Sequence, residues 1–81
     1  MKTVIIYDQC FERPVSFYIV EGDLSHLNGV YGNHCNYDEK LQNELFKHVF
    51  DSEWNQLPAL SEFPVQAVKD GAIVIVCGFL P

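Results

Sequence analysis

The C-terminal part of the chain carries its clearest strand signal. Residues 72–77 are six consecutive apolar residues, Ala-Ile-Val-Ile-Val-Cys, and most of them are β-branched. A strand with one face in water would alternate apolar and polar residues, so the unbroken run predicts a central strand covered on both faces. Asp70-Gly71 directly precedes the run and is typical of a hairpin turn. We therefore expect it to pair through a tight turn with a short strand at 65–68.

Two further strands are expected in the N-terminal quarter. Residues 3–7 form a short β-rich run, and residues 15–20 alternate so that Val15, Phe17 and Ile19 share one face. We interpret these two runs as an antiparallel hairpin. The segment 21–36 is rich in glycine and asparagine, which predicts an irregular loop with one helical turn at 24–28.

One long helix is predicted from Asn36 to the neighbourhood of Asp51 or Trp54. Asn36 is a favourable N-cap, and Glu39 three residues later can complete a capping box. Apolar side chains then recur at helical spacing: Leu41, Leu45, Phe46, Val49 and Phe50. They cover about half of the helix circumference, which is more than a helix needs to pack on one sheet.

These elements predict one small α+β domain over residues 1–81, with the order ββαββ. We expect a four-stranded sheet with the long helix on one face. A β-grasp has this order, with the first and last strands as parallel neighbours at the centre, and an all-antiparallel sheet is the alternative. The chain ends Gly78-Phe79-Leu80-Pro81 rather than Gly-Gly, so we do not expect a carrier activated at its terminal carboxylate.

Charge and composition narrow the classes of partner. Eleven acidic and five basic side chains give a net charge of −6. Such a surface repels nucleic-acid phosphates and anionic membranes, so neither is expected as a direct partner. The chain shows no secretory leader and no run long enough to span a membrane, which predicts a cytoplasmic protein with reduced thiols.

The cysteines and histidines give weak signals for chemistry. Cys10, Cys35 and Cys77 lack the close pairing typical of zinc ligands, so no metal and no other cofactor is predicted. Cys35 is the best candidate nucleophile because it precedes the predicted helix, with His34 or His26 as its base. This pattern supports an alternative function as a small cysteine- and histidine-dependent enzyme, a redox protein or a ligand-binding protein.

Aromatic and acidic residues at the two ends of the predicted helix favour another function. Trp and Tyr are common interface anchors, because each buries a large area and keeps one polar group. The predicted partner-binding residues are Tyr31, Tyr37, Phe50, Asp51, Glu53 and Trp54.

We therefore expect a non-enzymatic, acidic protein-binding domain. It would act as an inhibitor, adaptor or small subunit by occupying a basic surface of another protein, and a homodimer is a further possibility. One specific form is a phage or mobile-element product that inhibits a host defence protein, for instance by filling a basic nucleic-acid-binding groove.

Overall fold

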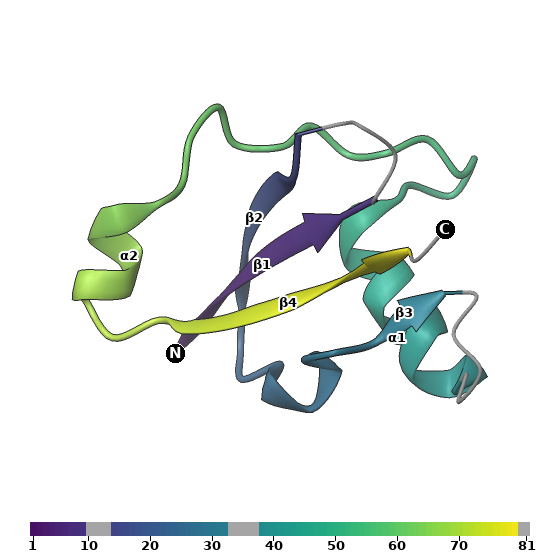
Figure 1. Cartoon of the computed structure of the whole chain (residues 1–81), viewed down its shortest axis with the longest axis horizontal. Coiled ribbons are helices and arrows are strands. Elements are labelled where there is room, and N and C mark those ends of the chain that lie inside the picture. The colour runs from purple at the N-terminus through teal and green to yellow at the C-terminus, as the bar shows by residue number, and fades with distance from the viewer. Residues whose placement is uncertain (10–13, 33–37, 80–81) are drawn as a thin grey trace.

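A mixed sheet with one long helix on one face forms the body of the protein (Figure 1). The computed structural model describes residues 1–9, 14–32 and 38–79. The three long strands are β1 (Lys2–Asp8), β2 (Ser16–Glu21) and β4 (Ile73–Phe79). A two-residue strand, β3 (Tyr31–Gly32), extends one edge. The helical elements are the 3₁₀ turn η1 (Ser25–Leu27), α1 (Glu39–Val49) and α2 (Val65–Lys69).

The strands lie in the order β2-β1-β4-β3, so the two ends of the chain meet in the middle of the sheet. β1 pairs antiparallel with β2, which confirms the predicted N-terminal hairpin, and parallel with β4. The parallel pair excludes the all-antiparallel alternative and gives the arrangement of terminal strands expected from the β-grasp comparison. The α+β class is confirmed, but the order ββαββ is wrong, because the element before β4 is a helix.

The predicted strand at 65–68 is the short helix α2, and Asp70-Gly71 is its C-cap rather than a hairpin turn. The Gly71 N–H donates to the Val68 carbonyl at 3.0 Å, and the Ala72 N–H donates to the Ala67 carbonyl at 3.0 Å. This pair of bonds is a Schellman motif, and Gly71 supplies the left-handed residue that the motif requires, with φ +97°. The same dipeptide serves hairpins and helix ends, so local sequence did not distinguish them.

The strand covered on both faces is β1 rather than β4. Val4 and Ile5 point to opposite faces of β1, and both are completely buried. In β4, Ile75 and Cys77 are buried in the core, whereas Val74 and Val76 on the other face are 40% and 39% exposed. α2 contacts β1, while this face of β4 stays partly open to solvent. β4 pairs with β1 over most of its length but with β3 only at Gly78 and Phe79, so it has a strand on both sides only at its end. The predicted burial of β4 on both faces is wrong.

Helix α1 begins two residues later than predicted. Asp38 is the N-cap, and its Oδ1 accepts hydrogen bonds from the backbone N–H groups of Lys40 at 3.0 Å and Leu41 at 3.2 Å. Asn36, the predicted cap, lies outside the described residues. The helix ends at Val49, and Leu45 and Val49 from its inner face join the core formed by β1, β4 and η1.

Shortening a side chain of β4 should destabilise the protein strongly only when that side chain faces the core. Ile75→Ala should lower the free energy of unfolding by about 2–5 kcal/mol, because the 1% exposed side chain leaves a cavity. Val76→Ala is the matched control on the open face, where we expect a loss below about 1 kcal/mol. Urea unfolding of both variants measures the difference. Equal losses would contradict the assignment of the two faces.

Candidate functional site

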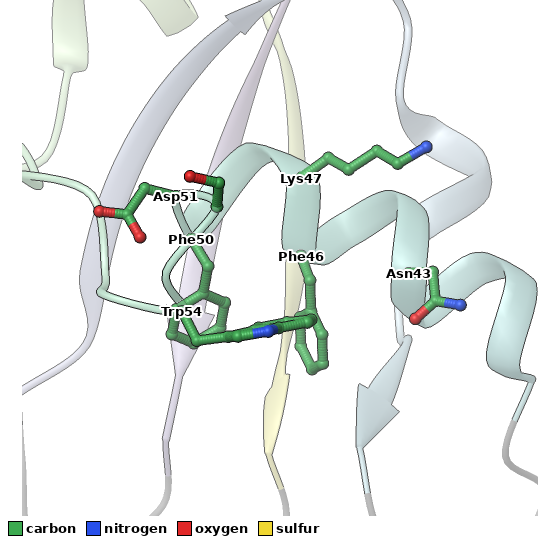
Figure 2. A pocket seen from close by; sticks show the side chains of 7 residues that line it. Asn43, Phe46, Lys47, Phe50, Asp51 and Trp54 are labelled. Atoms are coloured by element: carbon green, nitrogen blue, oxygen red, sulfur yellow. The ribbon is translucent and has the colours of Figure 1, made fainter.

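A shallow pocket lies at the C-terminal end of α1, where the helix passes into the connector to α2. It has a volume of about 570 Å³ and is drawn in Figure 2. Three aromatic rings form its apolar part, and the remaining side chains are polar. Its lining residues are Asn43, Phe46, Lys47, Phe50, Asp51, Ser52 and Trp54. We call this site the aromatic pocket.

The three rings of the aromatic pocket hold one another in place. Phe46 meets Phe50 edge to face with 5.3 Å between ring centroids, and it meets Trp54 edge to face at 6.0 Å. Phe50 and Trp54 are 6.1 Å apart with tilted planes. On its inner side, Phe50 also contacts Tyr7 of β1 edge to face at 6.1 Å. The cluster is thus continuous with the core, and its outermost member, Trp54, is 67% exposed.

The loop that presents Trp54 is organised by the Asp51 carboxylate. Asp51 Oδ1 accepts hydrogen bonds from the backbone N–H groups of Glu53 and Asn55, both at 2.9 Å. Two main-chain bonds close the same turn, from Trp54 N–H to the Asp51 carbonyl at 3.1 Å and from Asp51 N–H to the Asn55 carbonyl at 2.9 Å. Within this turn Trp54 adopts φ +64°, a left-handed conformation that is costly for a bulky residue.

A second set of hydrogen bonds fastens the end of this loop to the sheet. The Leu57 N–H donates to the Val49 carbonyl at 2.8 Å, which ties the connector back to the end of α1. The Tyr18 hydroxyl of β2 donates to the Leu57 carbonyl at 2.9 Å. The side-chain amide of Gln56 donates to the Tyr18 hydroxyl at 2.8 Å and to Ser16 Oγ at 3.0 Å. The loop that forms part of the aromatic pocket is therefore held in place by α1 and β2.

Opposite charges border the aromatic pocket. Asp51 lies on one side of the rings, and the exposed Glu53 follows it in the loop. Lys47 also lines the pocket, and its side chain extends away from the rings (Figure 2). The C-terminal end of α1 adds the partial negative charge of its last carbonyl groups. The local field thus favours a positively charged group over the rings.

The structure gathers half of the predicted partner-binding residues into this pocket. Phe50, Asp51 and Trp54 line it, and Glu53 lies in the same loop with its side chain exposed. Tyr31 lies apart from them, in β3, near the N-terminal end of α1. Tyr37 lies outside the described residues.

Four lining residues were missed as part of a binding site: Asn43, Phe46, Lys47 and Ser52. Phe46 belongs to the wide apolar stripe that the sequence showed, and it is one helical turn before Phe50. Residues four apart share a helix face, so this spacing could have placed Phe46 beside Phe50. The approach of Trp54 to both rings had no signal in the sequence, because it depends on the path of the loop.

The cysteine and histidine candidates do not converge among the described residues. Cys77 is completely buried in β4, and burial raises the pKa of its thiol to about 12. His26 Nε2 lies in hydrogen-bonding contact with Glu44 Oε1 at 2.9 Å, and this contact is exposed. Cys10, His34 and Cys35 lie outside the described residues. In the ranges 1–9, 14–32 and 38–79, no three metal-ligating side chains gather into a possible metal site.

The raised pKa of Cys77 predicts a thiol that does not react in the folded protein. In a Cys10→Ser, Cys35→Ser background, Cys77 should resist a thiol reagent at about pH 8, because the buried thiol stays protonated well above the pKa of a free cysteine. It should react fully once urea unfolds the chain. Mass spectrometry counts the modified molecules in both states. Fast labelling of the folded protein would show that Cys77 is reachable as a nucleophile.

The Asp51 turn should be required for the geometry of the aromatic pocket. Asp51→Ala removes the acceptor of two backbone hydrogen bonds and should lower the free energy of unfolding by about 1 kcal/mol. Asp51→Asn keeps one oxygen acceptor and should retain most of that stability. Urea unfolding followed by Trp54 fluorescence tests both variants. If Asp51→Asn and Asp51→Ala destabilise the protein equally, the hydrogen bonds to the Asp51 side chain do not stabilise the turn as we propose.

Comparisons with models of known protein families, with curated proteins and with solved structures gave no significant match. Among the described helices, none combines the length and the apolar character needed to cross a membrane. The functional argument therefore rests on the residues of the aromatic pocket.

Proposed function

We propose that the protein is a non-enzymatic binding domain that uses the aromatic pocket to attach to a basic surface of another protein. It would act there as an inhibitor, an adaptor or a small subunit. The observation that carries this proposal is Trp54, a large aromatic side chain that is 67% exposed and held at φ +64°.

Folding alone does not account for Trp54. Glycine or asparagine would adopt the left-handed conformation at lower cost, and an exposed indole contributes less to stability than a buried one. Strained residues of this kind are enriched at binding and active sites, where the side chain rather than the backbone is required. Its ring contacts with Phe46 and Phe50 restrict the indole before any partner arrives, which lowers the entropic cost of binding.

Charge supports a basic partner. The net charge of −6 attracts cationic surfaces over long distances, and Glu53 lies beside the anchor where it can guide the final approach. Asp51 has a different role from the one expected for a rim carboxylate, because its Oδ1 organises the loop. Glu53 contributes only its backbone N–H to that turn, so its side chain can be changed without removing the turn.

The test measures how two variants bind a partner captured from the native host and then purified. Trp54→Ala should weaken binding by about 2 kcal/mol or more, mainly through faster dissociation. Glu53→Lys should slow association and reduce its salt dependence, since rim charges act on the encounter of the two proteins. Biolayer interferometry at several salt concentrations gives both rates.

Two exposed positions away from the aromatic pocket serve as matched controls. Val65→Ala shortens an apolar side chain that is 52% exposed, and Glu62→Lys makes the same charge change as Glu53→Lys. Both controls should bind as the parent protein does, and circular dichroism should show all four variants folded. If Trp54→Ala and Glu53→Lys also bind like the parent, the aromatic pocket is not the interface and the proposal is wrong.

A further inference from the structure

We propose that the aromatic pocket is a receptor for a single arginine side chain of the partner. This inference rests on the proposed function and specifies the chemistry of its anchor. Three features of the pocket favour a planar cation: an exposed indole ring, a carboxylate that lines the same pocket, and the carbonyl end of a helix.

The exposed ring of Trp54 supplies the surface on which a guanidinium can stack. Cations are attracted to the faces of aromatic rings, and indole is the strongest of the aromatic side chains in this interaction. Phe46 and Phe50 meet Trp54 from the protein side, at 6.0 and 6.1 Å between centroids, and 67% of Trp54 stays in contact with solvent. A ligand can therefore approach Trp54 from outside without moving the cluster.

Asp51 supplies the matching negative charge. Both hydrogen bonds that its side chain accepts within the loop end on Oδ1, which leaves Oδ2 to accept from a bound cation. The loop bonds also fix the orientation of the carboxylate, so little entropy is lost when a ligand binds. The C-terminal end of α1 favours positive charge at the same place.

Arginine fits this pocket better than lysine or an apolar side chain. Its guanidinium is planar and weakly hydrated, so it can stack on an indole and donate to a carboxylate at the same time. Lysine presents a strongly hydrated point charge that loses more on leaving water. An apolar side chain would gain the ring contacts but would leave Asp51 partly desolvated without a donor.

Substitution of Lys47 can test whether the ligand of the aromatic pocket is a cation. Lys47 borders the aromatic pocket and its side chain points away from the rings, so its ammonium group repels a bound cation from a distance (Figure 2). Lys47→Gln keeps most of the stem and removes this repulsion. The variant should therefore bind an arginine probe more tightly, whereas a pocket for apolar groups would show no such gain.

The experiment uses Trp54 as its own reporter, since it is the only tryptophan of the chain. The intact protein is titrated at low salt with N-acetyl-arginine methylamide, and Trp54 fluorescence follows binding. The matched probes are the corresponding derivatives of lysine and norleucine. We expect saturable binding of the arginine probe in the millimolar range, as befits one isolated side chain, and weaker binding of both other probes.

Charge-removing variants then locate the site. Asp51→Asn keeps the turn but loses the charge. We expect its affinity for the arginine probe to fall by about two- to fivefold. Lys47→Gln should raise the affinity for the arginine probe by a factor in the same range. Glu62→Gln and Lys69→Gln make the same charge changes at exposed positions outside the pocket and should have no effect.

Several results would overturn the inference. These are absence of saturable arginine binding, equal binding of the lysine or norleucine probe, or arginine binding that Asp51→Asn and Lys47→Gln leave unchanged. The proposed function can survive such a result, because partner binding would still depend on Trp54 and Glu53. If partner binding does not depend on Trp54, the proposed function fails whatever the probes show.

Discussion

The parallel pairing of β1 with β4 is the constraint on which the rest of the structure depends. It joins the first and last strands of the described chain in register from Thr3↔Ile73 to Asp8↔Gly78. Two parallel strands cannot be linked by a tight turn, so the intervening chain has to cross the sheet and return to the same end. The register also requires glycine at position 78, since a Cβ there would collide with the backbone of Asp8.

The return path of the chain explains where the aromatic pocket lies. α1 packs against one face of the sheet, and the chain must then travel back to the start of β4 (Figure 1). The turn at Asp51 begins this return, and the bonds from Leu57 to Val49 and from Tyr18 to Leu57 direct it along β2. The pocket is thus a product of the same crossover that completes the sheet.

Two properties of the aromatic pocket, rigidity and charge, come from the same few residues. The Asp51 carboxylate holds the turn through one oxygen and gives the rings a negative neighbour. Phe50 links the exposed Trp54 to the buried Tyr7, so the outer ring rests on the core of the domain. A preorganised aromatic anchor with a fixed charge beside it is well suited to recognising one side chain on an otherwise basic surface.

The sequence by itself determined the elements whose signals are local. Backbone geometry sets which residues of a strand or helix share a face, so local patterns of apolar residues identify these elements. Examples are the β-branched run of β4, the alternation of β2 and the apolar stripe of α1. The stripe also showed more apolar surface on α1 than one sheet face needs. The same stretch of sequence held Phe50, Asp51 and Trp54, which line the aromatic pocket.

Only the tertiary structure decided the features that depend on distant parts of the chain. Asp70-Gly71 ends a helix instead of forming a hairpin, because β4 pairs with β1 and not with residues 65–68. Val76 is partly exposed although it belongs to the same apolar run as the buried Ile75, because which face of a strand is covered depends on the elements packed against it. Trp54 meets Phe46 and Phe50 through a turn set by Asp51, and periodicity carries no information about the path of such a turn.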